Sequence, residues 1–217
     1  LARNFLQQVI SDDSPWCCFV SLTEPHDPFV TGEAAFSQYE VDAIPLQPNV
    51  HNKLTDQPNL YRKAGRPWQG MNDRQRREAA ACYYASITEI DEQFGTLIDM
   101  VNVAGQRENT IIVLTSDHGE LLGSHGLYCK NISGFEEVYQ IPLVISGPEV
   151  GEGIVSSARV GLHDIAPTLL ELAGLPPIGM PDSKSFSSVL SNEKNACEYA
   201  HGFAEYHGGR YRLTQRV

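Results

Sequence analysis

An acidic residue and a histidine stand side by side where an α/β protein usually binds its ligand. Asp117 and His118 directly follow residues 110–115 (TIIVLT), an apolar and β-branched run that is typical of a buried strand. Ligands of open α/β sheets bind beyond the carboxyl ends of the strands. A carboxylate and an imidazole at that place, with Gly119 allowing the backbone to turn sharply, can both reach one divalent cation. A metal site is thus one interpretation of these residues, although a capped loop is the commoner structure for such a tripeptide taken alone.

Helix and strand patterns alternate around this pair. Residues 141–146 (IPLVIS) repeat the pattern of a short buried strand, and residues 164–174 indicate a helix that ends at Gly174. The clearest helix begins at Asn72, with Gln75 three positions on as in a capping box, and ends at Gly105. Its expected apolar face consists of Tyr83, Ile87, Ile90, Phe94, Leu97 and Val101. This alternation predicts an α/β fold, with a mainly parallel sheet flanked by helices.

A further strand is expected near the N-terminus. Residues 17–22 (CCFVSL) form a continuous apolar run followed by Pro25 and Pro28, which predicts a buried strand that ends in a loop. The five cysteines form no C-x-x-C pair, and Cys17 and Cys18 are expected to be buried thiols.

Residues 29–70 are rich in Pro, Asn, Asp and Gln with little periodicity, which predicts a long excursion over the surface. A substrate-side lid is one interpretation of that excursion.

The charge balance excludes several kinds of partner. The chain has 217 residues and a formal net charge of −11, which disfavours nucleic acid and anionic membrane surfaces because these partners need a basic patch. No apolar run approaches the roughly 20 residues that cross a bilayer. The sequence leaves the cellular compartment and the oligomeric state open.

A longer pattern extends the Asp117–His118 signal. Residues 116–146 (SDHGELLGSHGLYCKNISGFEEVYQIPLVIS) closely resemble the signature of the sulfatase family in the alkaline-phosphatase-like superfamily. In that family S-D-H-G-E is followed by G-x-H-G, an aromatic residue, a lysine, an acidic patch and a P-L-I strand. Residues 19–29 (FVSLTEPHDPF) resemble a second family segment, and residues 162–170 (LHDIAPTLL) a third. The resemblance runs from about residue 5 to Gly174, and more weakly to Tyr206.

The resemblance implies specific roles for individual residues. Asp117 and His118 would bind a divalent metal, most often Ca²⁺ with Mn²⁺ or Mg²⁺ as alternatives. Lys130 would contact the sulfate group, and an ammonium there offsets charge that develops on the leaving oxygen. His26 would bind substrate or act as the general acid for the leaving alcohol. His125 would be a substrate-binding or supporting group, although Ser124 departs from the acidic residue that commonly precedes this histidine.

The resemblance also implies what the rest of such a site contains. Family members have an N-terminal strand with paired Asp ligands and a C/S-x-P-S-R motif that supplies a formylglycine nucleophile, and neither occurs in this sequence. We therefore expect an alkaline-phosphatase-like fold that is incomplete at its N-terminus. Residues 1–190 would form part of a sulfatase catalytic domain, and residues 191–217 would begin a C-terminal extension.

Three functions follow from this resemblance. The first is part of a metal-dependent sulfatase that acts on a small-molecule or saccharide sulfate ester, with the isolated chain inactive. The second is a phosphonate or phosphate mono- or diester hydrolase of the same superfamily, because a fold does not settle its chemistry. The third is a truncated, non-catalytic sulfatase-like module. The sequence does not identify the substrate or the metal.

Overall fold

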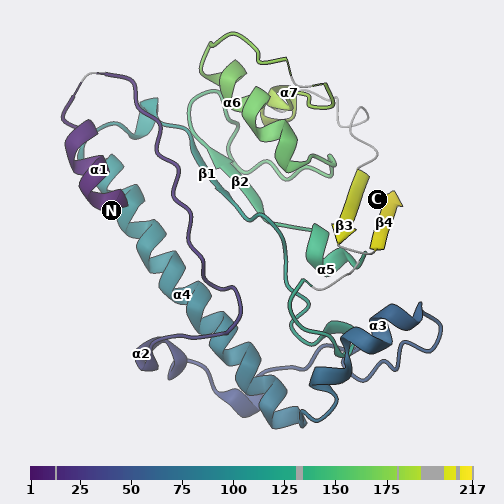
Figure 1. The fold of residues 1–217 in the computed structure, drawn as a ribbon. Coiled ribbons are helices and arrows are strands. Elements are labelled where there is room, and N and C mark those ends of the chain that lie inside the picture. Colours follow the sequence, from purple (N-terminus) through teal and green to yellow (C-terminus); the bar gives the residue numbers. More distant parts are fainter. Residues whose placement is uncertain (13, 131–133, 180, 192–202, 209–210, 217) are drawn as a thin grey trace. The chain divides into compact units, whose positions relative to one another are not determined.

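The structure is a computed structural model that describes the chain apart from residues 13, 131–133, 180, 192–202, 209–210 and 217 (Figure 1). It divides into two compact units. Unit 1 comprises Leu1–Arg107 and Gly119–Ser133, and unit 2 comprises Glu108–His118 and Gly134–Val217.

A single long helix organises unit 1 (Figure 1). Helix α4 (Asp73–Val103) begins with the predicted capping box, in which the Asn72 side chain accepts the Gln75 backbone N–H at 2.9 Å and the Gln75 side chain accepts the Asn72 N–H at 2.9 Å. Gly105 ends the helix with a φ of +70°, a left-handed conformation that favours glycine. Both predicted ends of this helix are confirmed. The remaining helices of unit 1 are α1 (Ala2–Val9), α2 (Glu33–Phe36), η1 (Val41–Ala43), α3 (Asn59–Ala64), η2 (Arg66–Trp68) and η4 (Ser124–Gly126).

Small residues form much of the most buried face of α4, and Val101 of the predicted apolar face is buried as well. Ala81 and Ala85 are completely buried, whereas Ile87 of the predicted apolar face is 43% exposed. Ile44 packs beside Ala80 and Ala81, together with Phe36, Tyr39, Val41, Tyr84 and Leu122. The alanines have short side chains, so α2 and η1 of the 29–70 excursion can approach the helix closely. This excursion has buried residues of its own against α4, and its role as a lid stays a prediction.

The strand predicted at residues 17–22 is not present. The segment is extended without a strand partner in the described structure, and Cys17 and Phe19 are exposed, Phe19 by 92%. The chain is tied to the α4 region before and well after this segment, because Trp16 Nε1 donates to Gln106 Oε1 at 3.1 Å and Ser86 Oγ donates to the Val30 carbonyl at 2.9 Å. The predictions of a buried strand and of a buried Cys17 thiol are therefore wrong. The apolar sequence favours an extended backbone, but burial also requires a neighbour to cover it.

The strands of unit 2 pair antiparallel. Strand β1 (Ile112–Thr115) pairs with β2 (Leu143–Ser146), and Thr115 lies opposite Leu143. The connection between them thus leaves and returns at the same end of the pair. A parallel pair would need a crossover along the full strand, and α5 (Glu136–Tyr139), the helix in this connection within unit 2, has only four residues. Strands β3 (Phe203–Gly208) and β4 (Tyr211–Arg216) also pair antiparallel, so the mainly parallel sheet is not confirmed in the described residues.

Buried polar groups hold the rest of unit 2 together. Helix α6 (Ile165–Leu172) follows η5 (Leu162–Asp164) and ends at Gly174 as predicted, with a φ of +64°. Asp164 is buried and accepts the backbone N–H groups of Gly161 and Lys184, each at 2.9 Å. The remaining elements are η3 (Arg107–Asn109), which joins the units, and α7 (Ser187–Leu190), whose Val189 packs with Phe186. In the described residues, no helix combines the length and apolar character that a membrane crossing requires.

Candidate active site

Asp117 and His118 lie at the carboxyl end of β1, as the sequence predicts. Asp117 Oδ1 accepts the His118 backbone N–H at 2.9 Å, and Ser116 Oγ donates to the His118 carbonyl at 2.7 Å. The Asp117 Oδ2 and His118 Nε2 atoms are 3.7 Å apart, with the two side chains 85% and 33% exposed. These contacts fix a turn that leaves the carboxylate and the imidazole next to each other and outside the core.

This pair fits part of a metal shell. A carboxylate oxygen suits Ca²⁺, Mg²⁺ and Mn²⁺ alike, and an imidazole nitrogen suits transition metals. Among the described residues, no third His, Cys, Asp or Glu side chain completes a group that could hold the ion. Because Ca²⁺ takes 6–8 oxygen ligands, a full site needs further donors.

His26 and Lys130 contact each other in unit 1, although they are far apart in the sequence. Lys130 Nζ lies against His26 Nε2 and is 4.0 Å from Asp27 Oδ1. On its other side, His26 Nδ1 is 2.7 Å from the Asp27 carbonyl oxygen. A carbonyl can only accept, so Nδ1 carries the hydrogen and Nε2 presents its lone pair to the ammonium. The contact therefore places a proton donor and an imidazole acceptor at one half-exposed position.

Glu120 shapes the loop that carries Lys130. A single carboxylate oxygen, Oε1, accepts the backbone N–H of Leu122 at 3.0 Å and that of Cys129 at 2.6 Å. Burial raises the pKa of Glu120, while these two hydrogen bonds and the nearby Lys130 charge act in the opposite direction. The Gly123 N–H also donates to the Leu127 carbonyl at 2.8 Å, which closes the loop on itself. Sequence reasoning missed this role of Glu120, for which the available signal was an acid two positions after His118.

Cys129 has a protonated thiol beside these carboxylates. Burial raises its pKa to about 12, and the negative charges of Glu120 and Asp27 add to this effect more than the Lys130 charge opposes it. The thiolate is the nucleophilic form of cysteine. Cys129 therefore acts as a packed, neutral group near Lys130 and not as a nucleophile.

His125 is held by the 29–70 excursion. Its backbone N–H donates to Asn49 Oδ1 at 3.1 Å, and its ring Nε2 is 3.2 Å from Asn49 Nδ2. The backbone of His125 has a φ of +57°, which is uncommon for a residue with a side chain. These contacts link the loop to the excursion, and direct substrate binding by His125 stays a prediction.

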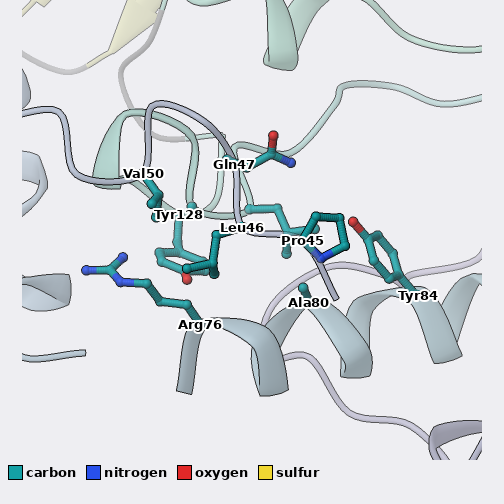
Figure 2. Close-up of a pocket in the computed structure, with 10 residues that line it drawn as sticks. Pro45, Leu46, Gln47, Val50, Arg76, Ala80, Tyr84 and Tyr128 are labelled. Atoms are coloured by element: carbon teal, nitrogen blue, oxygen red, sulfur yellow. The ribbon is translucent and has the colours of Figure 1, made fainter. Parts of the chain in front are cut away.

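A hollow of about 260 Å³, including the solvent at its mouth, lies on another part of unit 1 (Figure 2). The Tyr128 ring within it lies 5.2 Å from the Trp68 ring, between centroids, and the buried Arg76 guanidinium extends beside it. The lining comes from α4, the 45–50 segment and the Lys130 loop: Pro45, Leu46, Gln47, Val50, Arg76, Ala80, Tyr84, Leu122, Gly123 and Tyr128. The predicted site residues are not among them, so this hollow is not the predicted substrate site.

The sequence model of the sulfatase family matches residues 1–175. The chain belongs to the sulfatase family. It is 34% identical over 170 residues to a choline-sulfatase from Rhizobium meliloti, covering 74% of this chain and 32% of that protein. It is 30% identical over 199 residues to an ulvan-active sulfatase from Formosa agariphila, covering 88% of this chain and 35% of that protein. This sulfatase chain thus spans about a third of the length of these two relatives.

Solved structures of phosphonate monoester hydrolases share the fold of this chain. A phosphonate monoester hydrolase from Agrobacterium radiobacter superposes with a TM-score of 0.80 at 25% identity, covering 94% of the sulfatase chain and 44% of that structure. A phosphonate monoester hydrolase from Silicibacter pomeroyi gives a TM-score of 0.76 at 26% identity, covering 83% and 38%. The expected alkaline-phosphatase-like fold is therefore confirmed at the level of the family.

The structure places the predicted site residues in two groups. His26, His125 and Lys130 belong to unit 1, and Asp117 and His118 belong to unit 2. Within each unit, the contacts His26–Lys130 and Asp117–His118 are present. A single pocket that holds both groups stays a prediction.

Proposed function

We propose that this chain is part of a metal-dependent sulfatase and supplies the groups that bind the sulfate ester and protonate its leaving oxygen. The substrate would be a small-molecule or saccharide sulfate ester. The nucleophile, a formylglycine hydrate, would come from outside these 217 residues, so the chain alone would be inactive. Family membership and the contact between Lys130 and His26 support this proposal.

The contact between Lys130 and His26 carries the proposal. A sulfate ester that enters here meets the Lys130 ammonium, which is 36% exposed and can turn from His26 toward an anionic oxygen. During hydrolysis a new bond forms at sulfur, the bond from sulfur to the alcohol oxygen breaks, and that oxygen must gain a proton. Once Lys130 has turned to the sulfate, the His26 Nε2 atom is open to take a proton from solvent, and the imidazolium then gives a proton to the leaving alcohol.

Asp117 and His118 are proposed as ligands of the divalent cation. Ca²⁺ is the first candidate, with Mn²⁺ and Mg²⁺ as alternatives. When bound, the cation would polarise the nucleophile and the sulfate oxygens. The role of the chain's own residues is to hold two of the donors at the end of β1.

A second candidate function is hydrolysis of a phosphonate or phosphate ester. The two phosphonate monoester hydrolases that superpose on this chain favour it, because they share the fold. A third candidate, a non-catalytic sulfatase-like module, would bind an anion at Lys130 without turnover.

Leaving-group dependence tests the proposal. In the whole protein that contains this chain, His26→Ala should slow hydrolysis of an alkyl sulfate about a hundredfold but that of 4-nitrophenyl sulfate much less, because nitrophenolate leaves without a proton. His51→Ala is the matched control, since His51 is an exposed histidine of unit 1 that lies 3.4 Å from Asp73. Equal slowing of both substrates would refute the general-acid role. Faster turnover of a phenyl phosphonate than of any sulfate ester would favour the second candidate, and no turnover of either class the third.

A further inference from the structure

The loop that carries Lys130 has an unfavourable backbone. Leu122, His125 and Cys129 have φ values of +40°, +57° and +61°, and all three carry side chains. Left-handed backbone is unfavourable for such residues, because their Cβ atom comes too close to the following carbonyl oxygen. A loop with three such residues keeps its shape only if other contacts hold it there.

Glu120 is the side chain best placed to hold it. Its Oε1 atom accepts two N–H groups, one at each end of the loop, at 3.0 Å from Leu122 and 2.6 Å from Cys129. One oxygen that accepts both N–H groups ties the two ends of the loop to a single point. Both donors belong to residues with a positive φ, so the carboxylate holds two of the three such positions in the loop.

The contact with Cys129 acts directly on Lys130, the next residue. The direction of the Cys129 N–H bond and the φ angle of Cys129 together determine the position from which the Lys130 backbone continues. A second tie supports the same end of the loop, because the Leu121 N–H donates to the Cys129 carbonyl at 3.4 Å. If the Glu120 contact is lost, the Cys129 N–H is freed and the Lys130 ammonium loses its fixed position beside His26.

We propose that Glu120 is a positioning residue for sulfate binding, which acts by holding Cys129 so that Lys130 faces the ester. This inference rests on the proposed function only in taking Lys130 as the sulfate-binding group. Glu120 does not touch the substrate. It works through the geometry of one acceptor oxygen, and its negative charge is secondary.

Two variants of Glu120 distinguish the effect of the position of its side-chain oxygen from the effect of its negative charge. Glu120→Gln keeps an oxygen at the same distance along the side chain but removes the charge, whereas Glu120→Asp keeps the charge and withdraws the oxygen by one methylene. Glu89→Asp is the matched control, because Glu89 lies elsewhere in unit 1 and also accepts a backbone N–H, that of Gly32 at 3.1 Å. Two readouts are compared in the whole protein: hydrogen exchange of the Cys129 amide, and the affinity for inorganic sulfate by calorimetry.

The two Glu120 variants should differ in their affinity for sulfate. Glu120→Asp should speed exchange of the Cys129 amide and weaken sulfate binding about tenfold, whereas Glu120→Gln should change the affinity less than about threefold. Glu89→Asp should leave both readouts unchanged.

Three results would overturn the proposal. In the first, Glu120→Gln weakens sulfate binding as much as Glu120→Asp, which assigns the effect to charge. In the second, the Cys129 amide exchanges faster without a loss of sulfate affinity, which separates the loop from binding. In the third, the Cys129 amide of Glu120→Asp stays as protected as in the unchanged protein. A protein that binds sulfate with this dependence but hydrolyses no sulfate ester would contradict the proposed function alone.

Discussion

Replacing Lys130 with methionine should weaken binding of the sulfate ester about 10- to 100-fold. Two unit charges about 4 Å apart interact by roughly 4 kcal/mol at an effective dielectric constant of about 20. The Lys130 side chain is 36% exposed, so solvent reduces this to about 1–3 kcal/mol. Removing the ammonium also leaves the Asp27 carboxylate, 4.0 Å away, without this counter-charge and close to an anionic ester. Both effects act in the same direction.

The assay is the KM for an aryl sulfate and the inhibition constant of inorganic sulfate, in the whole protein at two ionic strengths. Methionine preserves most of the aliphatic length of lysine, so packing changes little. Lys63→Met is the matched control, because Lys63 is exposed on α3 of the same unit. If Lys130→Met changes both constants less than twofold, or only as much as Lys63→Met, the assignment of Lys130 to the sulfate group is refuted.

Three further outcomes are expected. Asp164→Ala should lower the free energy of unfolding by about 2–5 kcal/mol in urea titrations, because two backbone N–H groups lose the buried Asp164 carboxylate as their acceptor, and a loss below about 1 kcal/mol would contradict this. Iodoacetamide at pH 8 should alkylate exposed Cys17 at least tenfold faster than Cys129, as read by mass spectrometry, because a pKa raised to about 12 keeps the Cys129 thiol protonated until far more alkaline pH. Asp117→Asn and His118→Ala should each weaken Mn²⁺ binding to metal-stripped whole protein at least tenfold by calorimetry, and unchanged affinity in both would remove them as ligands.

Local backbone rules predicted the ends of α4 and α6 correctly. The Asn72 capping box and the glycine stops at Gly105 and Gly174 each depend on residues a few positions apart, which the sequence displays directly. The buried face of α4 was predicted less well. Ala81 and Ala85 are buried because α2 and η1 lie against them, and hydrophobicity alone ranks an alanine below a nearby isoleucine such as Ile87.

Strand pairing depended on information that periodicity does not contain. The strands at residues 112–115 and 143–146 were expected, but their antiparallel register follows from where the connection leaves and returns. The apolar run at residues 17–22 predicted burial that the structure does not provide. A hydrophobic pattern reports what a segment can bury and not which neighbour covers it.

The sequence predicted the residues of the candidate site, but it did not predict the hydrogen bonds of Glu120 that hold the Lys130 loop. Asp117, His118, His26 and Lys130 were found through motif spacing, and the structure brings them together as two pairs. The contact of Glu120 with Leu122 spans two residues and resembles a local turn. Its contact with Cys129 spans nine residues of irregular loop, which no periodic pattern specifies.

The extended segment at residues 17–22 has a consequence for how the protein behaves in concentrated solution. An apolar stretch with unpaired backbone groups is a template on which a strand of another molecule can add, and Phe19 and Leu22 lie exposed along it. A net charge of −11 keeps such molecules apart by mutual repulsion at low salt. At physiological ionic strength and above, charges are screened beyond about 8 Å, and this protection fades while the apolar attraction stays. We therefore expect self-association of this chain to increase with salt concentration, as light scattering at rising ionic strength would test.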